Sequence, residues 1–265
     1  MSDQGWFGPD SVAWRLHSDA TMLVAAMRAL MVQALEPRAM AGVAQHSDYQ
    51  RDPWGRLDRT VRFILNTTYG DSDTAEAAVG TVRKIHEHVR GIDPTTGRAY
   101  SAGDPDLLLW IHAVEVHSVV HCYRRYGGGL SDTDADRYVV EMGRVAQELG
   151  LPAAMTPASM AELRHYLDGM DGSLQITPAA RSALRTILVP PLPLALTLLR
   201  PLALIPTTAA IATLPAVARR LYGLPWFPPA TPPLRAGVFA LTRVLNFVVP
   251  EAPEVRAARA RTRAA

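Results

Sequence analysis

The chain has 265 residues, of which 48% are hydrophobic and only 20% are charged, so it can bury a large core and wholesale disorder is excluded. A formal net charge of +2 produces no field that would favour nucleic acid as a partner. One cysteine, Cys122, excludes a disulfide framework and multi-cysteine metal sites, and one lysine, Lys84, makes Schiff-base and P-loop chemistry poor candidates.

The first ten residues carry two aspartates, Asp3 and Asp10, and no basic residue. A secretory signal peptide begins with a basic segment, so this end is not predicted to be one. We therefore expect a cytoplasmic protein.

Helix start and stop signals recur along the chain. At four of the expected helix starts a capping residue stands directly before a proline, and a proline at the first helical position loses no helical hydrogen bond. These pairs are Asp52-Pro53, Asp104-Pro105, Thr156-Pro157 and Thr177-Pro178. Capping-box spacing relates Asp73 to Glu76 and Ser131 to Asp134. The glycines expected to follow helix ends are Gly70, Gly91, Gly127 and Gly150.

These signals and the apolar spacing between them predict an all-α protein. Expected helices cover 19–36, 38–46, 53–69, 73–90, 105–126, 132–149, 157–170 and 178–188, followed by proline-broken segments to about 221 and a helix over 234–249. No alternating run is long enough to build a sheet, and no linker or repeat divides the chain. We predict a single domain over 1–265, a bundle of about ten helices. The basic tail over 251–265 is expected to be solvated or frayed.

The run from Ile187 to Ala218 has only one charged residue, Arg200. A membrane-spanning helix needs about 20 apolar residues in succession. Six prolines precede or interrupt this run, at 190, 191, 193, 201, 206 and 215. We therefore favour buried, kinked core helices, and a peripheral membrane contact stays open.

One face of the helix expected over 73–90 carries a histidine between two arginines. Arg83 and Arg90 flank His86 at i−3 and i+4. This pattern suits a metal-bound macrocycle, with imidazole on the iron and guanidinium groups on anionic side groups. The alternative is a solvated basic face with an incidental histidine. The helix over 53–69 has a second polar face, made of Arg56, Arg59 and Thr60 at i, i+3, i+4.

The helix over 105–126 is rich in histidine. His117 and His121 have the i, i+4 spacing that a helix offers to zinc, but Ser118 stands where the zincin motif needs glutamate. A non-haem metal site built from His112, Glu115, His117 and His121 remains an alternative. Cys122, in the middle of this helix, is expected to be buried and inert.

Several segments resemble the latex-clearing-protein (rubber oxygenase) and MpaB-type oxygenase family. The resemblance is strongest over 51–226. Its segments are DPWGRLDRT at 52–60, VRKIHEHVRG at 82–91, DPDLLLWIHAVEVHSVV at 104–120, GGLSDTDADRYVVEMGRVAQELGLP at 128–152 and LPAVARRLYGLPW at 214–226. Their order and spacing are more specific than any one of them.

The resemblance implies an all-α fold that encloses a b-type haem, and an enzyme that uses dioxygen to cleave isoprenoid double bonds. By position, His86 corresponds to the proximal iron ligand and Arg83 and Arg90 to its flanking arginines. The distal side matches Arg56 and Thr60. Further cofactor-binding positions are His112, as a supporting residue, and Arg219.

Two positions depart from the rubber oxygenases. Arg59 stands where those enzymes have a lysine that can cap the iron, and a guanidinium has no lone pair for a metal. No motif matches the glutamate that those enzymes use as a base, although Glu36 lies in the same region. Polyisoprene is therefore not singled out as the substrate.

The leading prediction is a haem b-dependent oxygenase or oxidase acting on an apolar small molecule or an isoprenoid or lipid-like chain. Dioxygen would meet the face that carries Arg56, Arg59 and Thr60. The alternatives are the non-haem metal enzyme on helix 105–126 and a non-catalytic haem- or lipid-binding helical protein. The sequence does not define the oligomeric state.

Overall fold

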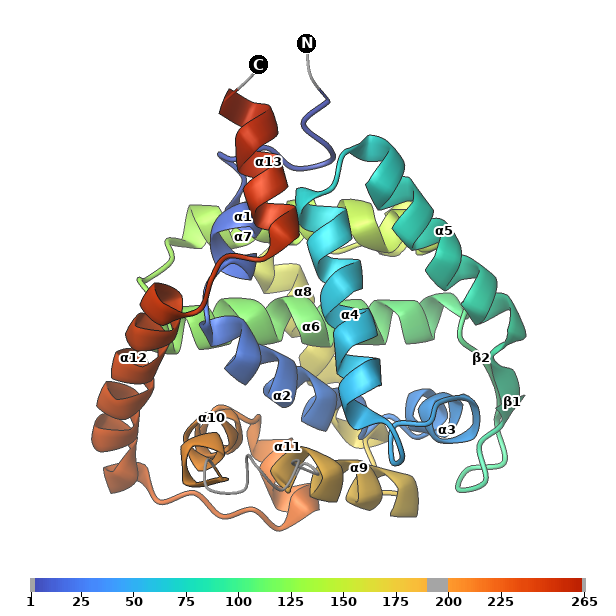
Figure 1. Ribbon diagram of the computed structural model, residues 1–265. Helices are drawn as coiled ribbons and strands as arrows, with labels where there is room; N and C mark the ends of the chain where they lie inside the picture. The colour runs from blue at the N-terminus through green and yellow to red at the C-terminus, as the bar shows by residue number, and fades with distance from the viewer. Residues whose placement is uncertain (1–2, 190–199, 264–265) are drawn as a thin grey trace.

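The computed structural model describes residues 3–189 and 200–263. Within that part the chain is all-α, as predicted, with 13 α-helices and one short β-hairpin (Figure 1). The helices are α1 Val12–His17, α2 Thr21–Gln33, α3 Pro37–His46, α4 Pro53–Tyr69, α5 Ser72–His88, α6 Pro105–Tyr126, α7 Asp132–Glu148, α8 Met160–Met170, α9 Pro178–Leu188, α10 Arg200–Ala212, α11 Ala216–Tyr222, α12 Thr231–Val248 and α13 Pro253–Arg263. The strands are β1 Arg90–Ile92 and β2 Ala99–Ser101, and 3₁₀ turns cover Ala153–Met155, Asp171–Ser173 and Pro228–Ala230.

The local capping signals place several helix starts correctly. Asp52 accepts a hydrogen bond from the backbone N–H of Gly55 at 2.8 Å and caps α4. Ser131 and Thr177 cap α7 and α9 in the same way. At Asp104 the helix begins as predicted, but the carboxylate accepts from Ser101 N–H instead of capping α6.

Other local predictions are wrong. No helix starts at Thr156-Pro157, because Ser159 caps α8 and accepts from the N–H of Glu162 at 3.2 Å. The cap of α5 is Asp71, not Asp73. Helix α5 ends at His88 and not at Arg90, and the next residues enter β1, which pairs antiparallel with β2.

The β-hairpin was not expected from the sequence. Gly91 pairs with Tyr100, and a Cβ at Gly91 would lie only 2.7 Å from the Tyr100 hydroxyl oxygen and from Gln45 Oε1. Tyr100 is buried and its hydroxyl donates to Gln45 Oε1 on α3 at 2.7 Å. Packing against α3 therefore ends α5 early.

The centre of the molecule is the packed pair α2 and α6. Helix α6 also packs on α7, α8 and α12, so its side chains are buried on most sides. Trp110 is 1% exposed and donates from Nε1 to the carbonyl of Gln33 at the end of α2. Arg28 of α2 is 2% exposed and reaches α6 through Ser118.

Part of the proline-rich run lies outside the described residues, at 190–199. Within α10, Pro206 is inside the helix, and Ala209 and Ala210 are fully buried where α10 packs on α2 and α12. This part is a core helix, in agreement with the sequence prediction. Among the described helices, none has both the length and the apolar character needed to cross a bilayer.

The basic tail is not frayed over the described residues. It forms α13, which packs on α4 and buries Val255 and Ala258. The Arg261 side chain donates to the carbonyl of Tyr69 at the end of α4, at 2.5 Å. Helix α13 therefore fixes the end of α4 that joins α5.

Candidate functional site

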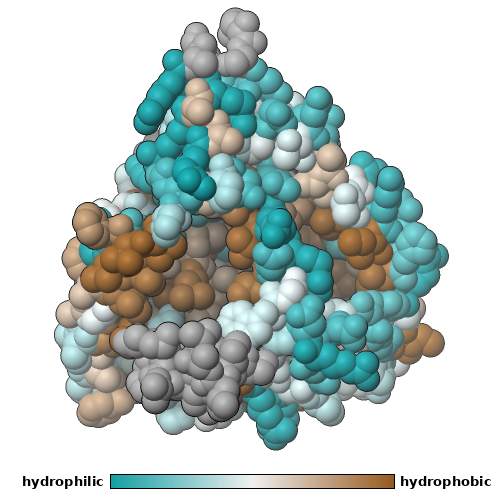
Figure 2. Space-filling view, in the orientation of Figure 1, coloured by the Kyte–Doolittle hydropathy of each residue, from teal (hydrophilic) through white to brown (hydrophobic). Residues whose placement is uncertain are grey.

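Helices α4 and α5 meet at their short connection and diverge toward their other ends (Figure 1). The space-filling view shows this face hollowed on either side of α4, with hydrophobic residues on the walls (Figure 2). In Figure 1, α6 crosses behind α4 and α2 lies to the side of the lower half of α4. On α2, Leu23 is 44% and Leu30 is 38% exposed. An apolar interior surface is thus open beside α4.

The inward face of α4 changes from buried to exposed along its length. Thr67, Thr60 and Arg56 are spaced at seven and eleven residues and share one face of the helix. Thr67 is 2% exposed, whereas Thr60 is exposed and Arg56 is half-buried. All the buried residues of α4 lie in its last turn. The first half of this face therefore borders open space and not core.

The inward face of α5 changes in the same way. Ala75 and Val79 are buried, at 0% and 3% exposure. His86, two turns further along the same face, is half-buried. At 100° per residue, His86 lies within about 20° of both residues around the helix. His86 is therefore on the core side of α5, near its open end.

His86 has an unusual environment for a surface helix. Its Nδ1 is buried without a hydrogen-bond partner among the described residues. Burial lowers the pKa of the imidazole, so the ring is neutral at physiological pH and can offer a lone pair. The neighbouring Lys84 is about 160° away around the helix and lines a surface hollow with His46 and His88. Lys84 points away from the His86 face.

The two arginines that flank His86 in the sequence are placed differently. Arg83 is exposed on α5, about 60° from His86. Arg90 lies in β1 and donates to the carbonyl of Glu87, so it does not share a helical face with His86. The prediction that Arg83 and Arg90 both share a helical face with His86 is wrong for Arg90, although both arginines remain close to His86 along the chain.

Arg56 and Arg59 of α4 have different partners in the structure. Arg56 donates to Ser47 Oγ at 2.9 Å, and burial together with the nearby Arg59 charge lowers its pKa. Arg59 is exposed and pairs with Asp52 at 3.7 Å. Thr60 donates to the carbonyl of Arg56 at 3.1 Å, which leaves its oxygen able to accept a further hydrogen bond.

His112 is buried on α6, and its Nε2 has no partner in the described part of the chain. Burial lowers the pKa of His112 to about 4, so this imidazole is neutral. Arg219 of α11 donates to the carbonyl of Leu214 at 2.6 Å, and nothing in the described residues brings it to His86. The structure thus provides two buried imidazole nitrogens without a partner, on α5 and α6.

The non-haem alternative on α6 is not supported by the geometry. Glu115 and His117 are two residues apart and therefore about 160° apart around the helix. His117 Nδ1 accepts from Arg28 Nη2 at 3.2 Å, and its ring lies 5.7 Å from that of His121. Over the described residues, no three histidine, cysteine, aspartate or glutamate side chains gather closely enough to hold a metal ion.

Two carboxyl groups behave differently from what the sequence indicates. Glu36 is 4% exposed and caps α3 by accepting from Ala39 N–H, and it also pairs with Arg38. Burial raises the pKa of Glu115 to about 7, so this carboxyl can exchange a proton near neutral pH. The sequence signal for Glu115 was a carboxylate beyond the first turn of the helix, between Val114 and Val116.

A buried polar chain near Glu115 was also missed. His17 of α1 shares hydrogen bonds of 2.7 Å with Thr68 Oγ1 of α4 and with the hydroxyl of Tyr138 of α7. The charge of Glu115 contributes to the raised pKa of Tyr138. The chain connects three helices that are far apart in sequence, so no local motif reveals it.

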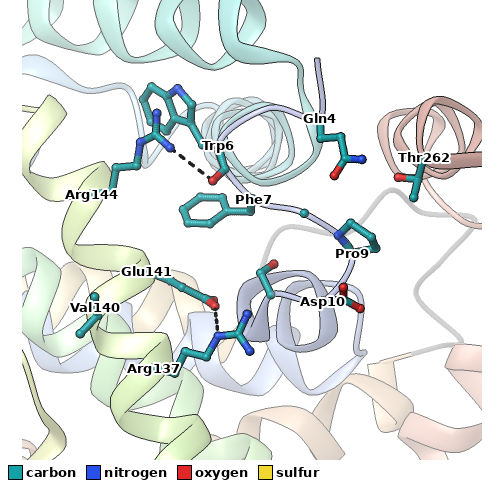
Figure 3. A pocket seen from close by; sticks show the side chains of 12 residues that line it. Gln4, Trp6, Phe7, Pro9, Asp10, Arg137, Val140, Glu141, Arg144 and Thr262 are labelled. Carbon is teal, nitrogen blue, oxygen red and sulfur yellow. Dashed lines mark hydrogen bonds and ion pairs between the residues drawn. The ribbon is translucent and has the colours of Figure 1, made fainter. Parts of the chain in front are cut away.

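A separate pocket of about 570 Å³ lies between the N-terminal segment and α7 (Figure 3). Three of its charged side chains are already paired. Glu141 accepts from the N–H groups of Val12 and Ala13 and pairs with Arg137, and Arg144 donates to the carbonyl of Trp6. We interpret this pocket as the junction that fixes α1 on α7.

A comparison with known protein families identifies the family of the chain. The family described as "ER-bound oxygenase mpaB/B'/Rubber oxygenase, catalytic domain" matches residues 14–247. The chain belongs to this family. It is accordingly an oxygenase of the MpaB/rubber-oxygenase family, and the resemblance over 51–226 is confirmed and extended at both ends. No curated protein and no solved structure matches the chain significantly.

Proposed function

We propose that this member of the MpaB/rubber-oxygenase family is a haem b-dependent oxygenase with its cofactor between α4 and α5. The observation that carries the proposal is His86. It is a neutral imidazole on the core side of α5, with a buried nitrogen that has no partner in the described chain. It lies toward the end of α5 that diverges from α4, and this face of the molecule is hollowed beside α4 with hydrophobic walls, the environment in which proteins hold haem.

His86 would hold the haem iron, and α4 would supply a wall of the site. Haem, when bound, would activate dioxygen for insertion into an organic substrate. Arg56 lies on this face of α4 and would donate a hydrogen bond to an oxygen-derived negative charge in a water-poor site. Thr60, whose hydroxyl proton is engaged by the Arg56 carbonyl, would accept a hydrogen bond there. Arg59 has no lone pair and is paired with Asp52, so we do not assign it as a ligand.

The anionic side groups of haem need cationic partners at the rim. Arg83 is exposed beside His86 and suits this role, and Arg90 follows it at the start of β1. His112, neutral and without a partner at Nε2, would support the cofactor from α6. We retain Arg219 as a weaker candidate because its guanidinium is already engaged by the Leu214 carbonyl.

The substrate class follows from the walls of the site. Leu23 and Leu30 of α2 are exposed, and the view in Figure 2 shows a largely hydrophobic lining beside α4. Such a surface binds an apolar small molecule or an isoprenoid or lipid-like chain, with dioxygen as the second substrate. Turnover of such a compound in air would distinguish an enzyme from a haem or lipid carrier.

The decisive experiment compares two histidines at the end of α5. His86→Ala is expected to remove stoichiometric haem, measured as pyridine haemochrome, with the helical content in circular dichroism unchanged. His88→Ala is the matched control, because His88 is exposed on another face of α5 and hydrogen-bonds the carbonyl of Lys84. Normal haem content in His86→Ala together with loss in His112→Ala would assign the ligand to α6 instead.

A further inference from the structure

The outer face of α12 is apolar and exposed. Phe247 is 90%, Val248 66% and Val244 56% exposed, while Val238 and Thr242 on the opposite face are buried. Around the helix, Phe247 lies about 180° from Val238, so the exposed residues form a face of their own. In Figure 2, hydrophobic residues gather over this helix. Such a patch on a soluble domain usually marks an interaction site.

The charges on α12 are of one sign. The helix contains Arg235 and Arg243 and no aspartate or glutamate. The guanidinium of Arg243 lies 4.9 Å from the ring of Phe239, which is itself 43% exposed. Exposed aromatic residues beside arginines on one helix face are typical of a helix that lies in a membrane interface, with its cations among anionic headgroups.

A second copy of the chain fits this face less well. A twofold interface brings the same surface together with itself, so Arg243 would meet residues of its own helix. Because α12 has no carboxylate, two copies would bury guanidinium groups without a counter-charge from this helix. An anionic lipid surface supplies that counter-charge.

The position of α12 also connects it to the apolar interior. Helix α12 lies beside the hollow that separates it from α4, on the face seen in Figure 2. Helix α10, which packs on α12, leaves Leu204 59% exposed, and Phe227 just before α12 is 70% exposed. Exposed apolar residues thus occur on elements next to α12 as well.

We propose that α12 docks this protein on anionic lipid bilayers, with Phe247 and Val244 inserted among the acyl chains and Arg235 and Arg243 at the headgroups. Docking by α12 is independent of haem. If the proposed oxygenase acts on an apolar chain, the hollow between α12 and α4 would receive that substrate directly from the bilayer, and this last clause rests on the proposed function.

The test is co-sedimentation of the purified protein with phosphatidylcholine vesicles that contain or lack phosphatidylglycerol. The wild type should sediment with the anionic vesicles. The double variant Phe247→Ser with Val244→Ser should not sediment with these vesicles. The double variant Arg235→Ala with Arg243→Ala should bind them about thirtyfold more weakly, since each charge near such a surface contributes about fivefold to the affinity. Val140→Ser is the control, because Val140 is an exposed valine on α7, at 57% exposure.

Circular dichroism and haem content should be unchanged in all four proteins, because the substituted side chains are exposed. Wild-type protein that stays in the supernatant would overturn the proposal, as would α12 variants that bind like the wild type. Light scattering without lipid measures the oligomeric state and tests whether a second copy of the chain covers this face instead. A dimer that Phe247→Ser converts to monomer would assign the face to a second copy. Loss of haem without loss of vesicle binding, as in His86→Ala, separates the two proposals.

Discussion

The helix pairs α2–α6 and α4–α5 are built in opposite ways. The first pair is enclosed by α7, α8, α10 and α12, and Arg28 of α2 donates to Ser118 Oγ of α6 where the two helices touch. The second pair is buried only near its own connection, where α13 and α1 pack on α4. Toward the other ends, α4 and α5 leave the core and expose their inward faces.

The difference shows in the buried polar groups. Arg28 of α2 donates to the carbonyl of Thr213, to Ser118 Oγ and to His117 Nδ1, all within 3.2 Å. His86 of α5, by contrast, has a buried nitrogen with no partner in the described chain. A buried polar group without a partner is unfavourable for stability. Its presence at the open end of α5 is what a ligand-binding position requires.

The largest effect is expected in the first pair. Arg28→Ala removes the donor from three buried acceptors and leaves a cavity, so we expect a loss of about 3–5 kcal/mol in the free energy of unfolding. Urea unfolding followed by circular dichroism measures it. Arg62→Ala on α4 is the control, because Arg62 forms an exposed pair with Asp58 and should change stability by less than about 0.5 kcal/mol.

Arg28→Met tests the reason for that loss. Methionine refills much of the volume without a charge, so it should recover part of the stability lost in Arg28→Ala. Burial lowers the pKa of Arg28 to about 10, which shows that its charge is held at a cost. If both variants were as stable as the wild type, the α2–α6 pair would not depend on its buried polar contacts, and the contrast with α4–α5 would fail.

Where the start and stop signals of a helix are local, the sequence was sufficient to predict its bounds. The bounds of α4, α6 and α9 agree with the predicted 53–69, 105–126 and 178–188, since proline at the first turn and a glycine or a β-branched residue at the end act locally. Helix α1 was missed, because its first N–H groups are accepted by Glu141 of α7, 129 residues away. The β-hairpin was missed for a similar reason, since it depends on α3.

In the candidate site, too, the features that depend on local sequence were predictable and those that depend on distant contacts were not. The spacing around His86 and the family segments pointed to α5, and the structure places His86 on the core side of that helix. The sequence could not show that Arg90 leaves the helix, because Tyr100 and Gln45 decide where α5 ends. Nor could it show that burial raises the pKa of Glu115, because that depends on helices packed around α6 from elsewhere in the chain.

The second prediction concerns pH and sharpens the comparison at α6. Burial raises the pKa of Glu115 from its ordinary value to about 7, so the folded state keeps a proton that the unfolded chain loses. Stability contributed by this group is complete below about pH 4.5 and is lost as pH rises to about 7. Glu115→Gln should abolish that loss, which is at most about 3 kcal/mol.

The buried histidines act in the other direction. Burial lowers the pKa of His17 and of His112 to about 4, so their contribution is complete above about pH 6.5 and is lost as pH falls to about 4. Glu115→Gln should leave this loss of stability at acidic pH unchanged. Unfolding free energies at pH 5 and pH 8 measure both losses, with Glu148→Gln, an exposed glutamate on α7, as the control. If the loss of stability between pH 5 and pH 8 were the same in Glu115→Gln as in the wild type, the Glu115 carboxyl of the wild type would be solvated and not buried.

The third prediction addresses how α4 is held at its open end. Asp52 caps α4 and pairs with Arg59, and the first half of the helix buries little else. Asp52→Ala should cost about 1 kcal/mol. Faster amide exchange should follow in the first turns of α4 and not in its last turn. Asp52→Asn keeps the cap and should restore protection, whereas exchange that rises along all of α4 would show that the helix is held as one unit.

The smallest effect is expected at the rim of the second pair. Arg83→Ala should change the unfolding free energy by less than about 0.5 kcal/mol, because the side chain is exposed and borders solvent. It should nevertheless weaken haem retention, by about two- to fivefold, because an exposed ion pair to a cofactor side group contributes up to about 1 kcal/mol. Transfer of haem to apomyoglobin measures retention, and the absorption spectrum should show the same iron coordination as in the wild type. Arg62→Ala, equally exposed on α4, is the control for a general charge effect. Equal transfer rates in Arg83→Ala, Arg62→Ala and the wild type would return Arg83 to a solvated face, while His86 and the open end of α5 would keep their proposed role.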